Sequence, residues 1–146
     1  APGVELTDFY KKTRSAGFGK EVKRRIMLGT FVLSAGYYDA YFTRAQKVRQ
    51  LLYDKIQLIF KDFDFILLPT SPVTAFKAGE KTEDLIAMYL ADIYTVMANL
   101  VGIPAVSLPL FKHRNGMPFG LQVMANRFDE VSLLQVSHQI MKQKTL

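Results

Sequence analysis

The order of apolar and polar residues predicts helices in the first half of the chain. Residues 1–19 are polar and contain three glycines, which indicates a loop or a short helix. From Lys20 onward, apolar residues recur at three- and four-residue steps, the period of a helix with one buried face. The pattern predicts one helix from Lys20 to about Leu33 and a longer one at about 38–61. The expected apolar faces are Val22, Ile26, Thr30 and Leu33 in the first, and Val48, Leu52, Ile56, Ile59 and Phe63 in the second.

The second half of the chain alternates between short apolar runs and helical patterns. Residues 65–68 read as a buried strand, and a loop rich in Pro, Thr and Gly follows it to residue 84. A helix is expected at about 83–101, with Thr82 as its cap and with Gly102 and Pro104 ending it.

The last part of the pattern predicts a hairpin and a final helix. Strands are expected at 105–110 and 119–124, and the Asn-Gly pair between them favours a hairpin turn. Asp129 is placed to cap a last helix, whose expected apolar face is Val131, Leu134, Ser137 (or His138) and Met141. The predicted fold class is α/β, with a mixed sheet covered by helices. Three strands leave open edges, so we expect the sheet to be incomplete in residues 1–146.

The composition excludes several kinds of chemistry. The chain has 146 residues, of which 49% are hydrophobic and 22% charged, as in a globular protein. It has no cysteine, so disulfides and thiol nucleophiles are excluded, and its two histidines stand apart, which argues against a histidine-based zinc site or triad. No apolar run has the length of a membrane span. We expect a cytoplasmic protein, and the start at Ala1 suggests processing or a fragment.

One carboxylate lies within the most apolar region of the sequence. Asp92 falls on or beside the helical stripe that also contains Met88 and Val96. A buried carboxylate without a partner is costly, so we expect an ion pair, exposure at the edge of the stripe, or a cavity that holds a cation. Arg25, next to Ile26, is the candidate for an opposite charge that grips a carboxylate with two hydrogen bonds. Together the two would bind a zwitterion such as a free amino acid.

Five runs of the sequence resemble the C-terminal part of the amidase signature family. GIPAVSLP is typical of amidases in general, whereas KRRIMLGT and SAGYYDAYF are more particular to the branch of tRNA-dependent amidotransferases. The resemblance extends from about Tyr10 to Gln143. It identifies residues 1–146 as one C-terminal portion of an amidase domain, with residues 1–19 as a loop or short helix and 20–146 as the α/β part. The matching runs are GFGKEVKRRIMLGTFVLSAGYYDAYF, AQKVRQLL, LLPTSPVTAFKAGEKTED, MYLADIYTVMANLVGIPAVSLPL and NGMPFGLQVMANRFDE.

The resemblance implies an enzyme that hydrolyses glutamine and releases ammonia. The family uses a Ser–cis-Ser–Lys triad in a glycine- and serine-rich signature that this sequence lacks. Ser71 and Ser107 stand alone and are read as structural, so the nucleophile is expected upstream and the fragment inactive by itself. The ammonia would serve the partner B and C subunits in converting mischarged Glu-tRNA(Gln). No cofactor is expected in this chain, whereas ATP and magnesium are expected in the partner subunit.

The resemblance also implies roles for individual residues. By motif position, Arg25 would hold the α-carboxylate of glutamine, with Arg24 as the fallback, and Asp92 would hold its α-ammonium. Three tyrosines are possible walls of the pocket, although core packing is the simpler interpretation of each: Tyr37, Tyr38 and Tyr89.

Two alternatives remain open at this point. One is an amidase of the same family that acts on a different small amide. The other is a basic module that binds RNA or another partner, suggested by 19 basic against 13 acidic residues, a net charge of +6. A solvated helix face is the simpler explanation of that charge, and the sequence has no recognisable RNA-binding motif.

Overall fold

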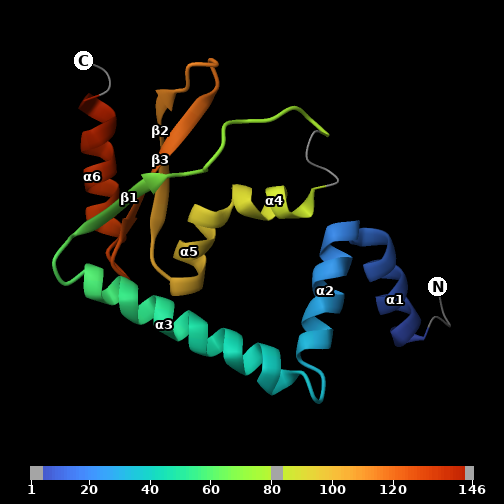
Figure 1. The fold of residues 1–146 in the computed structure, drawn as a ribbon. Helices are drawn as coiled ribbons and strands as arrows, with labels where there is room; N and C mark the ends of the chain where they lie inside the picture. The colour runs from blue at the N-terminus through green and yellow to red at the C-terminus, as the bar shows by residue number, and fades with distance from the viewer. Residues whose placement is uncertain (1–4, 80–83, 144–146) are drawn as a thin grey trace. The chain divides into compact units, whose positions relative to one another are not determined.

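The chain divides into two units that differ in secondary structure, Ala1–Lys47 and Val48–Leu146. The computed structural model describes residues 5–79 and 84–143 (Figure 1). The first unit is helical, and the second contains a sheet with helices on both faces. That residues 1–146 are one portion of a single domain stays a prediction.

The first unit consists of short helices, and none of its described residues, 5–47, is buried. Helices α1 (Leu6–Gly17) and α2 (Lys20–Val32) are followed by a π-helical turn, η1 (Tyr38–Thr43). None of these three elements contains a buried residue, and Ile26, expected on a buried face, is 49% exposed. The amphipathic pattern thus predicts the helix α2 correctly. The pattern does not specify which other element would cover the apolar side of this helix.

The long helix expected at about 38–61 is in fact two elements. The π-helical turn η1 leads directly into α3 (Arg44–Ile59). A π turn has a wider hydrogen-bond spacing than an α turn, and the apolar period of the sequence does not encode where it occurs. Of the five residues expected on the apolar face of this helix, Ile56 is buried and Leu52 packs against the core, whereas Val48, Ile59 and Phe63 are exposed.

The sheet of the second unit has three strands in the order β1-β3-β2. Its strands are β1 (Phe65–Pro69), β2 (Ala105–Lys112) and β3 (Pro118–Ala125). The expected hairpin is confirmed: β2 and β3 pair antiparallel, and the turn contains Gly116 at φ 84°. The register of this pair shifts between Leu108 and Phe111, around Pro109, which has no N–H to donate to a neighbouring strand.

The α/β class is confirmed, but the expected mixed pairing is wrong for the described strands. β1 and β2 both pair antiparallel to β3, from Phe65↔Ala125 to Pro69↔Leu121 in one case and from Ala105↔Met124 onward in the other. The helical crossover from β1 to β2 does make these two strands run in the same direction. They are not neighbours, because β3 lies between them.

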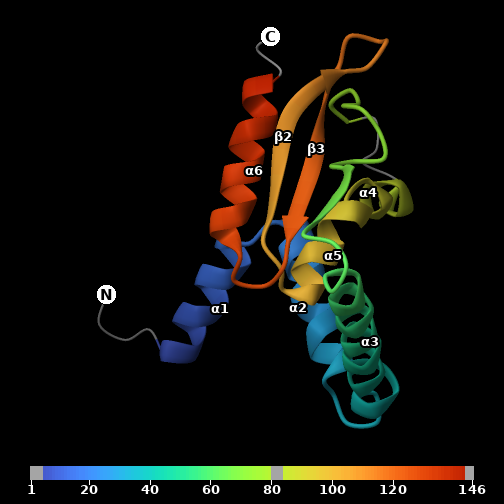
Figure 2. The ribbon, with the colours of Figure 1, turned by 90° about the vertical axis from the view of Figure 1, so that its left-hand side faces the viewer.

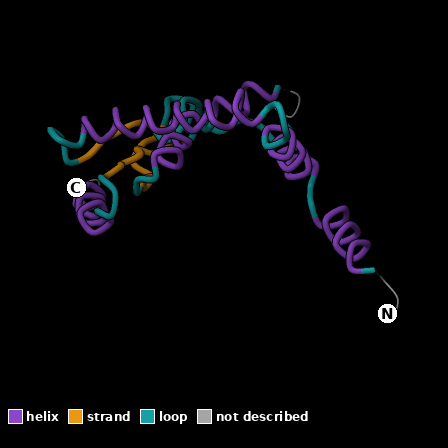
Figure 3. Tube along the Cα trace, turned by 90° about the horizontal axis from the view of Figure 1, so that it is seen from below, coloured by secondary structure: helices purple, strands orange, loops and turns teal. Residues whose placement is uncertain are grey.

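Helices cover the sheet on both faces, as Figures 2 and 3 show. On one face, Met124 of β3 packs with Ile56 of α3 and with Ala98 and Val101 of α5 (Ile93–Val101). On the opposite face, Val123 and Ala125 of β3 and Leu108 of β2 pack against α6 (Glu130–Gln143). The alternation of Val123, Met124 and Ala125 between two cores follows from the two-residue period of a strand.

The last helix begins directly after Asp129, as expected, and its expected apolar face is confirmed at Ser137 and Met141 but wrong at Val131 and Leu134. Leu133 and Ser137 are buried, whereas Val131 is 69% and Leu134 is 62% exposed. Ile140 and Met141 complete the packed face. Apolar residues occur on more than one side of α6, so the period alone could not choose the side that meets the sheet.

The helix expected at about 83–101 is interrupted. Helix α4 (Leu85–Ala91) ends at Asp92, and α5 begins after it. Thr82, the expected cap, lies outside the described residues. The cap of α4 is Asp84, whose carboxylate accepts a hydrogen bond of 2.9 Å from the backbone N–H of Ala87.

None of the described helices combines the length and the apolar character that crossing a membrane requires.

Candidate functional site

Asp92 lies at the joint between α4 and α5. Its φ of −101° and ψ of 5° end the first helix, and its carbonyl accepts hydrogen bonds from the Val96 N–H and the Thr95 hydroxyl, both at 3.0 Å. Its carboxylate makes no capping hydrogen bond to α5 and no ion pair with any described residue. The carboxylate is therefore available to a ligand.

Asp92 is exposed, and the residues that its helices bury are on another side. Ala98 and Val101 of α5 are buried, whereas Val96, on the stripe of Asp92, is 42% exposed. Of the three possibilities that the sequence left open for this carboxylate, exposure at the edge of the stripe is therefore confirmed. The segment is apolar on nearly all sides, so its period could not distinguish the buried stripe from the exposed one. Of the alternatives considered, the structure leaves an exposed position facing a cavity.

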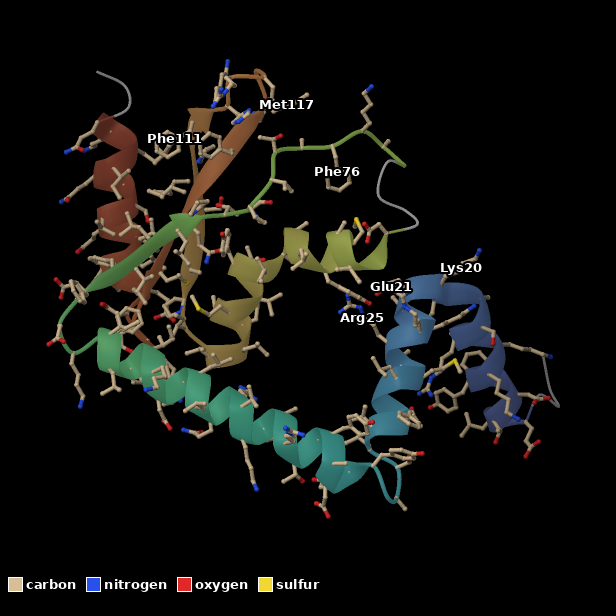
Figure 4. All side chains as sticks on the ribbon, viewed as in Figure 1. Lys20, Glu21, Arg25, Phe76, Phe111 and Met117 are labelled. Carbon is tan, nitrogen blue, oxygen red and sulfur yellow. The ribbon has the colours of Figure 1, made fainter. Side chains whose placement is uncertain are left out.

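This cavity, the Asp92 pocket, has a volume of about 420 Å³. It lies between the loop after β1, the helices α4 and α5, and the ends of β2 and β3. Figure 4 shows Phe76 on that loop, with its ring directed toward α4. Among the described lining residues, Asp92 is the one with a formal charge at neutral pH, and five others carry hydroxyl groups. The lining residues are Thr70, Ser71, Val73, Thr74, Ala75, Phe76, Met88, Ala91, Asp92, Thr95, Ser107, Pro118, Phe119 and Gly120.

A serine from the loop holds the joint that presents Asp92. The hydroxyl of Ser71 donates to the carbonyl of Ala91 at 3.3 Å, and Ser71 is itself half-buried. The carbonyl of Ala91 is in the last turn of α4, where intrahelical partners run out. Ser71 therefore ties the loop after β1 to the end of α4, next to the carboxylate.

Two hydroxyl groups from the outer strands meet above the central strand. Thr70 follows β1, Ser107 lies on β2, and their hydroxyl oxygens are 2.7 Å apart. Gly120 of β3 lies beneath them, and its carbonyl accepts a 2.9 Å hydrogen bond from the Thr70 N–H. All three residues line the pocket.

A second hollow, of about 450 Å³, shares part of this lining. Ser71, Val73, Thr74 and Phe119 belong to both, and Tyr94 and His113 add to the second. The imidazole of His113 accepts a 3.4 Å hydrogen bond from the Asn115 N–H, which makes it part of the β2–β3 turn. The second hollow therefore continues the Asp92 pocket toward the hairpin.

The candidate arginines, Arg24 and Arg25, are in the first unit, Ala1–Lys47. Arg25 and Glu21 both lie on α2 and are labelled in Figure 4. The Nε of Arg25 is 2.9 Å from Oε1 of Glu21. Arg24 pairs with the other carboxylate oxygen of Glu21. The side chain of Arg25 is 66% exposed and that of Arg24 is 42% exposed. We expected one of them to be drawn inward, but both side chains are exposed, as are their neighbours on α2, a helix without a buried residue.

The three candidate tyrosines are not in the lining of the Asp92 pocket. The Tyr37 ring lies 4.3 Å from that of Phe31, and the Tyr38 ring lies 4.8 Å from that of Phe42, so both pack against aromatic neighbours within the first unit. Tyr89 is on α4 and is 51% exposed. Their roles as pocket walls stay predictions, as do the roles of Arg24, Arg25 and Asp92 as ligands.

Sequence reasoning missed the residues at the floor of the pocket. Thr70 was read as part of a loop and Ser107 as structural, and the two are separated by 36 residues. Gly120 gave no signal, because a glycine within a strand has several causes. The order β1-β3-β2 is the information that joins the three positions. It could have been found only by pairing both outer strands with the third.

Comparisons with known proteins agree with the resemblance seen in the sequence. Residues 3–134 match the family model described as Amidase. The chain is 55% identical over 135 residues to the A subunit of a glutamyl-tRNA(Gln) amidotransferase from Brevibacillus brevis, and 57% identical over 134 residues to its counterpart from Clostridium botulinum. These matches cover 92% of the chain in both cases, and the chain spans 28% and 27% of the length of these relatives.

Solved structures confirm the α/β fold as part of the amidase signature fold. The A subunit of a glutamyl-tRNA(Gln) amidotransferase from Thermotoga maritima is similar with a TM-score of 0.60 and 52% identity, over 84% of this chain and 26% of that one. A 6-aminohexanoate cyclic dimer hydrolase is similar with a TM-score of 0.63 and 26% identity, over 77% and 25%. An amidase at 24% identity has a TM-score of 0.71 over 90% and 30% and shows the fold alone.

Proposed function

The chain belongs to the amidase family, and from that premise we propose that it holds the substrate glutamine in the glutaminase subunit of a tRNA-dependent amidotransferase. The observation that carries this proposal is the Asp92 pocket: it has one formal charge among its described lining residues, and that charge is a carboxylate without an ion-pair partner among them. Support for the substrate comes from relatives at 55–57% identity that are A subunits of glutamyl-tRNA(Gln) amidotransferases.

The chemistry of the pocket suits the α-ammonium group of an amino acid. An ammonium donates charge-assisted hydrogen bonds to a carboxylate, and such a bond contributes about 1.5–3 kcal/mol. Hydroxyl groups on the other walls can bind neutral polar atoms, and Phe76 and Met88 can contact the aliphatic part of the ligand. A volume of about 420 Å³ lies in the range of pockets for small ligands.

We extend the proposal to Arg25 as the ligand of the α-carboxylate, with Arg24 as the alternative. This part rests on motif position, and the exposed side chains of both arginines on α2 support it. Glu21 now occupies the position of a carboxylate partner, and an exposed pair of this kind contributes about 0–1 kcal/mol. A substrate carboxylate can therefore compete with Glu21 at low cost.

The proposal assigns the reaction itself to residues outside these 146. A lysine and two serines would activate the nucleophile that attacks the side-chain amide of glutamine and releases ammonia. The chain by itself is then expected to be inactive. In the cytoplasm, the partner B and C subunits, with ATP and magnesium in the partner, would use the ammonia to convert mischarged Glu-tRNA(Gln).

A second candidate is an amidase that acts on another small amide. The likeness to a 6-aminohexanoate cyclic dimer hydrolase favours it, because that protein shares the fold at 26% identity and is named for a different substrate. The two candidates differ in what they require of Asp92. A substrate without an ammonium group needs no carboxylate in the pocket.

The experiment compares glutamine with a neutral aliphatic amide in the intact subunit that contains these residues. Asp92→Asn should raise the KM for glutamine about 10- to 100-fold, since it removes one charge-assisted hydrogen bond, and should change the KM for the neutral amide little. Arg25→Ala should also raise the glutamine KM. Asp62→Asn, an exposed aspartate outside the pocket, is the matched control. An unchanged glutamine KM in both Asp92→Asn and Arg25→Ala would contradict the assignment.

A further inference from the structure

The floor of the Asp92 pocket contains a hydroxyl pair that the proposed function does not yet use. We infer that the Thr70–Ser107 pair binds the side-chain carboxamide of the ligand whose ammonium group Asp92 holds, and thereby selects a carboxamide over a carboxylate. This inference rests on the proposed function, and it adds the residues that determine specificity within the same pocket.

The pair depends on the absence of a side chain at Gly120. A Cβ at this position would overlap the Ser107 hydroxyl and would lie 2.8 Å from Thr70 Oγ1 and 3.2 Å from the carbonyl oxygen of Leu108. Contacts this short would displace one hydroxyl or the other. Glycine in the central strand therefore lets the two outer strands bring their hydroxyls together at 2.7 Å over the middle of the sheet.

A hydroxyl pair of this kind offers both a donor and acceptors. Each hydroxyl has one proton and two lone pairs, and the hydrogen bond between the two uses one proton and one lone pair. One proton and several lone pairs remain for a ligand at the floor of the pocket. A carboxamide matches this set, because its carbonyl accepts a hydrogen bond and its NH₂ group donates two.

A carboxylate matches the same floor less well. It only accepts hydrogen bonds, so it can use the free proton of the pair but not its lone pairs. In addition, the one formal charge among the described lining residues is the negative charge of Asp92, which repels a second carboxylate in the same pocket. Glutamine and glutamate differ in this group alone, so the floor is suited to distinguish them.

Selectivity between these two ligands is the measurement that tests the inference. In the intact subunit, we would measure the KM for glutamine and the inhibition constant of glutamate in Ser107→Ala, Thr70→Val and Thr70→Ser. The first two variants should raise the glutamine KM about tenfold, the effect of losing one hydrogen bond to the ligand, and change the glutamate constant less than about twofold. Thr70→Ser keeps the hydroxyl and should restore the selectivity.

The controls separate this inference from a general loss of structure. Ser132→Ala removes a hydroxyl from α6, outside the pocket, and should leave both constants unchanged. Thermal unfolding of each variant reports the stability of the fold, and Thr70→Ser remains informative if Thr70→Val is unstable. An equal change in the constants of glutamine and glutamate, or no change in either, would overturn the inference.

Asp92→Asn distinguishes a failure of the inference from a failure of the proposed function. Both ligands carry an ammonium group, so this variant should weaken both, and glutamate less than glutamine, because the substitution also removes the repulsion between Asp92 and the side-chain carboxylate of glutamate. If Asp92→Asn has that effect but the hydroxyl variants leave the ratio of the constants unchanged, the inference alone is wrong. If Asp92→Asn affects neither ligand, the proposed function is wrong and the inference with it.

Discussion

The helices α2 and α5 are both amphipathic, yet one buries its apolar residues and the other does not. In α5, Ala98 and Val101 are 6% and 4% exposed, because the sheet faces them. In α2, Val22 and Ile26 are 46% and 49% exposed, and no residue of the helix is buried. An apolar stripe thus predicts that a helix forms, whereas its burial depends on a second element that the stripe does not specify.

The two units also differ in charge. Ala1–Lys47 contains nine Lys and Arg residues against four Asp and Glu residues, a net charge of +5, and Val48–Leu146 contains ten against nine, a net charge of +1. Most of the excess positive charge is therefore in the unit whose described residues form no buried core, and this unit includes both candidate arginines. The candidate ammonium ligand, Asp92, is in the nearly neutral unit.

The largest expected contrast between the units comes from the same substitution at two methionines. Met124→Ala should lower the free energy of unfolding by about 2–5 kcal/mol, because Met124 is fully buried between β3, α3 and α5. Met27→Ala should change it by less than about 0.5 kcal/mol, because Met27 is 73% exposed on α2. Urea unfolding of the two variants measures both values.

One result would contradict the contrast between the two methionines. A loss at Met27→Ala as large as that at Met124→Ala would mean that another surface covers α2 in the protein.

A smaller contrast comes from alanine substitutions at two glycines, which should change the free energy of unfolding in opposite directions. Gly102 ends α5 at a φ of 74°, so Gly102→Ala should lower the free energy of unfolding by about 1–2 kcal/mol. Gly29 lies within α2, and a Cβ there would have no atom within 4 Å, so Gly29→Ala should raise it by about 0.5–1 kcal/mol. The same urea titration distinguishes the signs, and a gain at Gly102→Ala would contradict the role of its backbone conformation.

Most of the secondary structure could be predicted from the sequence, because local signals set it. The Asn-Gly turn, the glycine and proline after α5, and the short apolar run before Pro69 each act within a few residues, and the structure confirms the elements that they predict. The buried faces of the helices were harder to predict. In α6 and at 85–101, several sides are apolar, so the choice depends on which side meets the sheet.

The candidate site could be predicted only in part, for the same reason. Asp92 stood out, because a carboxylate in an apolar run is unusual, but its exposed position at a helix break was not encoded in the period. Thr70, Ser107 and Gly120 come together through the strand order, and no local pattern reports that order. The sequence thus indicated the charged group of the pocket, whereas its neutral floor required the structure.

The central claim is that Asp92 binds the ammonium group of a small amino-acid substrate. The most direct test is a crystal structure of the intact subunit with glutamine bound and its nucleophile inactivated. The account predicts the α-nitrogen within about 2.7–3.0 Å of an Asp92 carboxylate oxygen, the distance of a charge-assisted hydrogen bond. A bound glutamine whose ammonium group contacts other residues, with the Asp92 carboxylate in solvent, would contradict the account.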